Sequence, residues 1–339
     1  MYRSEITIDL AALRRNCATL LRALEGAELW AVVKADGYGH GARDVAGAAL
    51  TAGATALCVA TVPEALALRR EFATTRILVM GPASSREIAQ ARDAQLELAV
   101  SSDDIPPGVR VHVKIDTGMG RWGLAGLSAA PSLEVVGLMS HLATADCDAG
   151  YAEWQIDRFR AATAPYSHLT RHIANSAAAL RYPSARFDAA RCGIALYGIS
   201  PFGTDPAEDG LEPVLGWSSH LALVKLLRAG HSTGYGRRYI AERDTWIGIV
   251  PVGYADGFRR DLTGTQVRVA GELRPVVGTI SMDAFAVELD RELPVGSPVV
   301  LAGGGLTLDE HARVAGTIGY ELATGINSSP ARARRVVLS

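Results

Sequence analysis

Eight short apolar segments, separated by stretches of helical periodicity, fill the first 200 residues of the chain. They are rich in β-branched and aliphatic residues and have the length of buried strands. The strands are predicted at residues 29–35, 55–60, 76–81, 96–101, 109–115, 134–141, 170–175 and 188–196. Eight strand–helix units favour an N-terminal (β/α)8, TIM-like barrel, and an open doubly wound sheet is the alternative.

Helix start signals fall between these strands. Asp9 is suited to cap a helix over residues 9–24, because its carboxylate can accept the first free N–H groups. Pro63 at the first turn favours a second helix. Helices are predicted at residues 9–24, 63–72, 84–94 and 150–162.

The pattern changes near residues 201–216, where proline, glycine and aspartate cluster. Beyond this point short apolar runs alternate with turns, which is typical of a mostly β domain. Strands are predicted at 220–228, 246–253, 266–270, 275–280, 285–289 and 298–302, followed by a helix at 308–316. We therefore expect a barrel domain over residues 1–215 and a mostly β domain over residues 216–339.

Charge and cysteine content narrow the class of protein. The 34 basic and 36 acidic residues give a net charge of -2, which does not favour binding to nucleic acid. No uncharged apolar run approaches the roughly 18 residues of a membrane span, and the start has no signal-peptide pattern. The four cysteines are scattered and no metal-ligand spacing is present, so we expect a reduced, cytoplasmic protein without a metal.

Lysine is rare in this chain. Only Lys34, Lys114 and Lys225 contribute to the 34 basic residues, and the rest are arginines. Arginine does not give up its proton in a protein and therefore cannot serve as an amine nucleophile. Lys34 and Lys114 each lie at the end of a predicted barrel strand, where a solvated charge and a reactive amine are both possible.

Other polar residues also lie at the ends of barrel strands, which converge on one face of such a fold. His141, Ser176 and Arg191 are the main examples. Each has an ordinary structural explanation, but one ligand explains all of them together. A lysine amine can form a Schiff base with pyridoxal phosphate. Its phosphate prefers hydroxyl and backbone N–H donors near a helix start, which Tyr38, Ser176, Gly193 and Ile194 can offer.

Several sequence runs resemble the motifs of one family. AVVKADGYGHG (31–41) resembles the cofactor-lysine signature of alanine racemases. The runs that resemble its other blocks, in order, are VKIDTGMGRWG (113–123), SHLATAD (140–146), IANSAA (173–178), RCGIALYG (191–198), STGYGRRY (232–239), GYADG (253–257), GTISMD (278–283) and IGYE (318–321). The resemblance covers about residues 5–322.

This resemblance implies a fold-type III pyridoxal-phosphate enzyme that works as a head-to-tail homodimer, with each active site completed by the partner's C-terminal domain. The activity it implies is the interconversion of L-alanine and D-alanine, which supplies D-alanine for peptidoglycan. Lys34 resembles the Schiff-base lysine and the base for the D-enantiomer. Tyr235 resembles the base for the L-enantiomer, donated by the other subunit.

The remaining site residues follow from the same resemblance. For the cofactor, the matching residues are Tyr38, Ser176, Gly193, Ile194 and Tyr320 at the phosphate, Arg191 at the pyridine nitrogen and His141 beside the ring. For the substrate, they are Arg121 and Met282 at the carboxylate, with Tyr254 and Asp283 at the entry. Lys114 matches a lysine that is carbamylated in many members. The chain departs from the family at its C-terminus, NSSPARARRVVLS (327–339), and residues 124–133 look like a shortened connection.

Two bases on opposite faces of the substrate suit inversion, because a single base would mostly return the same proton. Arg191 has no acceptor and stays charged, so it favours an unprotonated pyridine nitrogen. A racemase of serine or of broad specificity remains an alternative, since one methylene discriminates by only about 1–3 kcal/mol. An amino-acid decarboxylase of the same fold and a non-catalytic cofactor carrier are more distant alternatives.

Overall fold

The computed structural model describes residues 2–102, 104–127, 132 and 134–339. The chain forms two compact units. The first, the barrel unit, comprises residues 13–212, and the second, the β unit, comprises residues 1–12 together with 213–339. Part of the predicted short connection at 124–133 lies outside the described residues.

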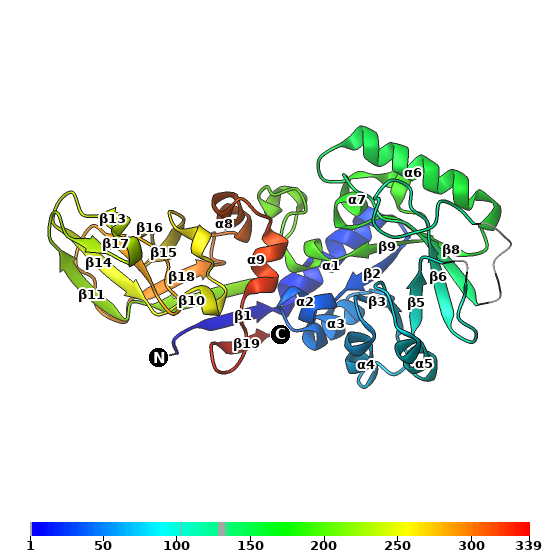
Figure 1. Ribbon diagram of the computed structural model, residues 1–339, viewed down its shortest axis with the longest axis horizontal. Helices are drawn as coiled ribbons and strands as arrows, with labels where there is room; N and C mark the ends of the chain where they lie inside the picture. The colour runs from blue at the N-terminus through cyan, green and yellow to red at the C-terminus, as the bar shows by residue number, and fades with distance from the viewer. Residues whose placement is uncertain (1, 103, 128–131, 133) are drawn as a thin grey trace. The chain divides into compact units, whose positions relative to one another are not determined.

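Within the described residues of the barrel unit, eight strands form one parallel sheet in the order β8-β7-β6-β5-β4-β3-β2-β9 (Figure 1). The strands are β2 (Glu28–Val32), β3 (Ala56–Val59), β4 (Arg76–Val79), β5 (Glu97–Val100), β6 (Arg110–Lys114), β7 (Val135–Met139), β8 (Thr170–His172) and β9 (Ala189–Cys192). The backbone N–H of Arg191 donates to the carbonyl of Ala174 at 2.9 Å and brings the two outer strands together. The barrel prediction is confirmed, and each predicted strand overlaps one of these eight.

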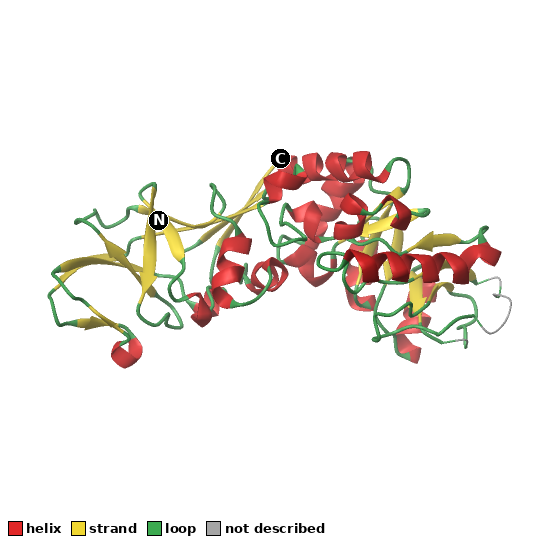
Figure 2. Ribbon diagram, turned by 90° about the horizontal axis from the view of Figure 1, so that it is seen from above, coloured by secondary structure: helices red, strands yellow, loops and turns green. Residues whose placement is uncertain are grey.

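Helices follow most of the strands and cover the outside of the barrel (Figure 2). The α-helices of this part of the chain are α1 (Leu10–Leu24), α2 (Lys34–Tyr38), α3 (Ala42–Thr51), α4 (Val62–Arg69), α5 (Ser85–Asp93), α6 (Ala149–Thr163) and α7 (Ser176–Arg181). The 3-10 helices are η1 (Ala164–Tyr166), η2 (Pro183–Ala185), η3 (Ile194–Tyr197) and η4 (Pro206–Asp209). The four predicted helices correspond to α1, α4, α5 and α6.

Local capping explains where these helices begin. The carboxylate of Asp9 accepts the N–H groups of Ala11 and Ala12 at 2.8 and 2.9 Å, as predicted. Thr61 and Glu64 form a reciprocal capping box at the start of α4. Each such cap satisfies N–H groups that the helix leaves free, and is worth about 1 kcal/mol.

The barrel interior contains polar side chains as well as apolar ones. Alternate residues of a strand point to the same face, so Arg110, His112 and Lys114 lie on one face of β6. His112 is 1% exposed and the ring of Trp30 packs edge-on against it. The strand therefore carries polar groups through the barrel from its amino end to its carboxyl end.

The described part of the β unit is built on a nine-stranded sheet in the order β11-β14-β17-β16-β15-β18-β10-β1-β19. Its strands are β1 (Glu5–Asp9), β10 (Leu215–His220), β11 (Leu223–Leu227), β14 (Thr245–Val250), β15 (Gln266–Val269), β16 (Glu272–Val277), β17 (Phe285–Leu289), β18 (Pro298–Ala302) and β19 (Arg334–Leu338). β12 (Ser232–Thr233) and β13 (Tyr239–Ile240) form a separate pair. The helices are η5 (Tyr235–Arg237), η6 (Tyr254–Asp256), η7 (Arg260–Leu262), α8 (Leu308–Ala315) and α9 (Gly319–Gly325).

Two features of the β unit differ from the sequence-based expectation. β1 pairs antiparallel with β10 and parallel with β19, so the start of the chain belongs to the same sheet as its end. The predicted strand at 220–228 is interrupted, because the chain turns at residues 221–222 between β10 and β11. The expectation of a mostly β second domain is confirmed.

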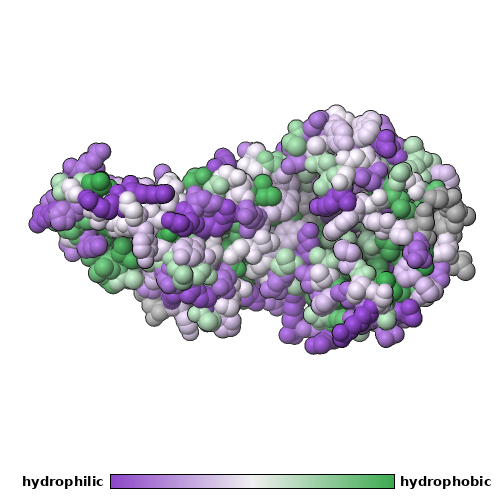
Figure 3. Space-filling model, viewed as in Figure 1, coloured by the Kyte–Doolittle hydropathy of each residue, from purple (hydrophilic) through white to green (hydrophobic). Residues whose placement is uncertain are grey.

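The surface drawn in Figure 3 mixes hydrophilic and hydrophobic residues, with hydrophilic side chains prominent over the β unit. None of the helices in the described ranges combines the length and the apolar character that crossing a bilayer requires.

Candidate active site

The predicted site residues of the barrel unit lie at the carboxyl end of the barrel strands. Lys34 lies two residues after the end of β2, Lys114 is the last residue of β6, and His141 lies two residues after the end of β7. Ser176 begins α7 after β8, and Arg191 lies within β9. In a parallel barrel these strand ends meet on one face, and the contacts below connect several of these side chains directly.

The chain after Lys34 folds into a left-handed turn. Ala35, Asp36, Gly37 and Tyr38 have φ of 51, 50, 61 and 53°. For residues with a Cβ this region costs roughly 1–2 kcal/mol each. Such strain persists only where surrounding contacts hold it, and it is common at functional sites.

Two carboxylates hold this turn. One oxygen of Glu64 accepts the N–H of Ala35 at 2.7 Å, while its other oxygen completes the α4 capping box. Asp36 accepts the N–H of Ala42 at 2.9 Å, where α3 begins. The helix caps that follow β2 and β3 therefore also fix the backbone beside Lys34.

The Lys34 amine is half-buried and its pKa is lowered from the ordinary value. Burial is the main cause, and the positive charge of Arg121 adds to it. The Nζ atom lies 5.9 Å from the centre of the Tyr38 ring. A lower pKa raises the fraction of neutral amine, the form that acts as a nucleophile or base.

Tyr38, Ser176 and Gly193 meet at one place. The Tyr38 ring stacks on Tyr197 with centres 4.9 Å apart, and a Cβ added to Gly193 would lie 2.6 Å from the Tyr38 hydroxyl oxygen. The Ser176 hydroxyl accepts the backbone N–H of Gly193 at 3.0 Å and that of Ala195 at 3.3 Å. Ile194, which begins η3, is 1% exposed. The absence of a side chain at Gly193 thus lets the Tyr38 hydroxyl approach this backbone closely, and two hydroxyl groups gather beside backbone N–H groups.

Arg191 is 4% exposed, and its Nη atoms donate to acceptors at the carboxyl ends of β7 and β8. They bond the carbonyls of Ser140 at 2.7 Å and His172 at 3.0 Å. His141 Nδ1 lies 3.3 Å from Arg191 Nη2. Burial and the Arg191 charge lower the pKa of His141 to about 3, so this imidazole is neutral at physiological pH.

The charged groups of Lys114 and Arg121 both lie over the indole ring of Trp122. Lys114 Nζ is 5.5 Å and Arg121 Cζ is 5.3 Å from the ring centre of Trp122. Burial and the nearby charge of Arg121 lower the pKa of Lys114 to about 8. The carboxylate of Asp116 accepts the N–H groups of residues 118, 119 and 120, which shapes the loop that carries Arg121.

The β unit presents three predicted site residues on neighbouring turns. Tyr235, Met282 and Tyr254 are 72%, 53% and 43% exposed. Tyr254 N–H donates to Ser281 at 3.1 Å, and the Tyr235 carbonyl accepts the Thr279 hydroxyl at 2.9 Å. Large side chains this exposed on adjoining turns are available to a ligand or to another chain.

Asp283 and Tyr320 also belong to the β unit. Asp283 is bonded to Arg332 at 2.9 Å and to Arg3 at 3.4 Å, and these charges lower its pKa. Tyr320 lies in the first turn of α9 and is half-buried. Arg332 belongs to the C-terminal run that departs from the family pattern, so this run reaches a predicted entry residue.

Several residues around the site were not predicted from the sequence. Glu64 bonds the backbone next to Lys34, Trp122 and Tyr197 contact predicted site residues, and His172 contacts Arg191. Glu64 had a visible signal, the T-V-P-E start of a capping box. The alternation of polar and apolar residues in VRVHVKI (109–115) indicates that His112 lies on the same face of its strand as Lys114.

Two family models together match nearly the whole chain. "Alanine racemase, N-terminal domain" matches residues 8–201, and "Alanine racemase, C-terminal domain" matches residues 214–336. The gap between them falls at the boundary between the two structural units.

Individual proteins give the same result. The chain is 40% identical to "Alanine racemase 1" of Bacillus subtilis over 350 residues, covering 95% of this chain and 90% of that protein. It is 41% identical to the alanine racemase of Streptomyces coelicolor over 372 residues, covering 97% and 95%. A solved structure, the biosynthetic alanine racemase from Pseudomonas aeruginosa, matches with a TM-score of 0.92 and 37% identity, covering 100% of both chains.

Proposed function

The chain belongs to the alanine racemase family, a family of isomerases, and on this basis we propose that it interconverts L-alanine and D-alanine. The proposal includes pyridoxal phosphate as cofactor, a homodimer with shared active sites, and the supply of D-alanine for peptidoglycan in the cytoplasm. The observation that carries it is the half-buried Lys34 amine with a lowered pKa at the carboxyl end of the barrel.

The barrel residues fit pyridoxal phosphate in two respects. Lys34 offers an amine with a raised neutral fraction, which covalent attachment of an aldehyde requires. The Tyr38 and Ser176 hydroxyls lie beside the backbone N–H of Gly193, and hydroxyl and N–H groups are the donors a phosphate prefers. The residues that would hold the cofactor are Lys34, Tyr38, His141, Ser176, Arg191, Gly193, Ile194 and Tyr320.

When bound, the cofactor supplies an electron-withdrawing ring that acidifies the substrate Cα–H. Of Lys34 Nζ and the Tyr235 hydroxyl, one would remove the Cα proton from one face and the other would deliver a proton to the opposite face, which inverts the centre. Lys34 acts on the D-enantiomer and Tyr235, from the partner subunit, on the L-enantiomer. Because Tyr235 is 72% exposed in its own chain, it is free to enter a neighbouring subunit's site.

Substrate binding falls to charged and backbone groups. Arg121 pairs with the substrate carboxylate in the bidentate geometry that a guanidinium favours. The Met282 backbone gives a second contact, and Tyr254 and Asp283 line the entry. A carbamate on Lys114 would convert a cation near Arg121 into an anion that orients it.

Arg191 limits side reactions. A guanidinium only donates hydrogen bonds, so it leaves the pyridine nitrogen unprotonated and moderates electron withdrawal by the ring. A carboxylate at this position would do the opposite and favour transamination. Arg191→Glu should therefore raise the yield of pyruvate from alanine, and an unchanged yield would contradict this role.

Product analysis tests the proposal. The purified protein with pyridoxal phosphate is given L-alanine or L-serine, and the D-enantiomer is measured by chiral chromatography. We expect D-alanine as the main product, with a loss of roughly 10²–10⁴-fold in Lys34→Ala. Lys225→Ala, which removes a lysine of β11 in the other unit, should keep activity. Preferential D-serine formation, an amine from decarboxylation, or no turnover would each contradict the proposal.

A further inference from the structure

A continuous line of buried polar side chains crosses the interior of the barrel and ends at Arg191. Glu97 Oε2 lies 2.9 Å from His112 Nε2. His112 Nδ1 lies 2.8 Å from His172 Nε2, and His172 Nδ1 lies 2.6 Å from Arg191 Nη1. The four residues are 3%, 1%, 0% and 4% exposed. Water therefore does not compete for these contacts, and each contact has to be satisfied within the chain.

The direction of every hydrogen bond in this line follows from Arg191. A guanidinium has donors only, so His172 Nδ1 is an acceptor and the His172 proton lies on Nε2. His172 Nε2–H then donates to His112 Nδ1, which leaves the His112 proton on Nε2, facing Glu97. A second proton on either ring would set two donors against each other. Both histidines are therefore neutral and share one tautomer.

The charges around the line agree with this assignment. Burial lowers the pKa of His112, and burial with the Arg191 charge lowers that of His172 well below the ordinary value. Burial alone would raise the pKa of Glu97, but the His112 hydrogen bond together with the nearby positive charges outweighs it and the net shift is downward. The line thus joins an ionised carboxylate to a guanidinium through two neutral rings.

Trp30 holds the two rings in place. Its ring centre lies 5.6 Å from that of His112 and 4.6 Å from that of His172. Trp30 is itself fully buried, and its indole N–H donates to Glu28 at 2.7 Å. Rings fixed in this way keep the geometry that a chain of directional hydrogen bonds requires.

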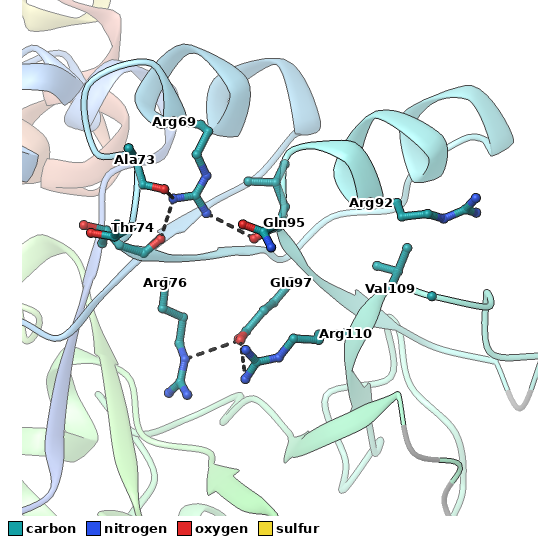
Figure 4. Close-up of a pocket in the computed structure, with 12 residues that line it drawn as sticks. Arg69, Ala73, Thr74, Arg76, Arg92, Gln95, Glu97, Val109 and Arg110 are labelled. Carbon is teal, nitrogen blue, oxygen red and sulfur yellow. Dashed lines mark hydrogen bonds and ion pairs between the residues drawn. The ribbon is translucent and has the colours of Figure 1, made fainter.

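The outer end of the line opens on a cavity of about 500 Å³ at the amino ends of β4, β5 and β6. Figure 4 shows Arg76 and Arg110 pointing toward Glu97 from either side. Arg76 Nε and Arg110 Nη2 lie 3.4 and 3.1 Å from its Oε1. Arg92 lines the same cavity but points away from the carboxylate (Figure 4). Glu97 therefore links an arginine-lined cavity at one end of the barrel to the active-site arginine at the other.

We propose that Glu97 is a positioning residue for Arg191 and acts on it across the barrel through His112 and His172. The carboxylate balances the guanidinium charge and accepts the His112 Nε2–H, which favours the same tautomers that Arg191 requires, so that Arg191 keeps one orientation. The proposal rests on the proposed function only for the consequence that Arg191 faces the cofactor ring. The hydrogen-bond polarity is a property of the protein alone.

The polarity is tested first without cofactor. Protein labelled with ¹⁵N in its histidine rings is measured by NMR, with His112→Gln and His172→Gln used to assign the signals. We expect both rings to be neutral and protonated at Nε2 on both sides of neutral pH. An imidazolium or an Nδ1-protonated ring at either position would overturn the proposal, whatever the protein catalyses.

The influence of Glu97 is tested with one buried and two exposed substitutions. Glu97→Gln keeps an acceptor but removes the charge, so we expect a shifted His172 Nδ1 signal and a fall of about ten-fold in kcat with KM little changed, the size of one lost charge-assisted hydrogen bond. Arg110→Gln should give smaller changes in the same direction. Arg92→Gln removes the same charge from the same cavity without touching Glu97, and should change neither quantity.

The outcomes separate the two proposals. If Glu97→Gln does not fold, Arg110→Gln against Arg92→Gln still decides the matter, because both side chains are exposed. Unchanged His172 signals in Glu97→Gln or Arg110→Gln, or equal effects of Arg110→Gln and Arg92→Gln, would overturn the positioning role and leave the racemase proposal intact. The expected signals in a protein that does not racemise alanine would overturn only the proposed function.

Discussion

Lys114 is a buried amine close to two other positive charges. It is 5% exposed, and Arg121 and Arg191 lower its amine pKa to about 8 in addition to the larger effect of burial. The two arginine charges repel a protonated Lys114 amine and so make the protonated form unfavourable. Conversion to a carbamate anion would relieve this repulsion, which gives a physical reason for the proposed modification.

A pH-dependent carbamate is therefore expected at Lys114. Carbon dioxide reacts with the neutral amine, whose fraction grows as pH rises through about 8. With ¹³C-labelled bicarbonate, a carbamate signal should increase over this range and be absent in Lys114→Arg. A signal that decreases as pH rises, or that survives the substitution, would contradict the expectation.

Arg332 is the second residue with a specific prediction. Its Nε lies 2.9 Å from Asp256, a carboxylate 1% exposed, and its Nη2 lies 2.9 Å from Asp283. Arg332→Ala should lower the free energy of unfolding by about 1–2 kcal/mol, because Asp256 keeps only Arg3 as an ion-pair partner among the described residues.

Arg334→Ala serves as its control. This side chain lies in the same C-terminal run, is exposed, and contacts the surface residues Glu5, at 3.5 Å, and Tyr2, whose ring centre is 4.8 Å from its Cζ. Its loss should change the free energy of unfolding by no more than about 0.5 kcal/mol. Equal urea midpoints for the two variants would show that Arg332, in the C-terminal run that departs from the family pattern, does not stabilise this part of the β unit.

At the scale of elements, the left-handed turn after β2 is the most unusual feature. Ala35 has a φ of 51° and is exposed. Ala35→Gly should raise the free energy of unfolding by up to about 1 kcal/mol, because glycine adopts this region without the Cβ penalty. Thermal or urea unfolding measures the change.

The same substitution in a regular helix gives the matched control. Ala18 is exposed in the middle of α1, where glycine is about 1 kcal/mol less favourable than alanine. The two variants should therefore change stability in opposite directions. A loss of stability in both would mean that the turn is not strained.

The barrel strands could be predicted because each is a short apolar run between helical segments. β1 could not be predicted in this way. Polar and apolar residues alternate in its five-residue sequence, EITID, and its partner strands lie more than 200 residues away along the chain. The left-handed turn was also invisible, because one glycine among five residues gives no such signal. Long-range pairing and strained backbone depend on tertiary contacts that local sequence does not encode.

The site was predictable to a similar extent. Residues at strand ends, such as Lys34 and Arg191, can be placed on one face once the barrel is inferred. Glu97 and His172 could not be connected to Arg191, because their contacts join strands whose spacing in the barrel depends on the fold. Only the alternation along β6 indicated that polar groups enter the interior.

At the scale of the whole molecule, the proposed mechanism requires the two bases of one site to come from different subunits. Lys34 belongs to the barrel unit and Tyr235 to the β unit. Tyr235, Met282 and Tyr254 are exposed on adjoining turns, where an isolated chain would leave them in water. The proposed head-to-tail homodimer would give these side chains a function, because each β unit would then complete the other chain's barrel site.

Mixed dimers show whether the two bases of one site come from different chains. Lys34→Ala and Tyr235→Phe chains, each inactive alone, are tagged differently, mixed by reversible dissociation, and the hybrid dimer is purified and assayed for D-alanine. We expect about half the activity of a wild-type dimer, since one of its two symmetric sites keeps both bases. A stable hybrid dimer as inactive as its parents would rule out a shared site, because it would mean that the lysine and the tyrosine serve the same site only within one chain.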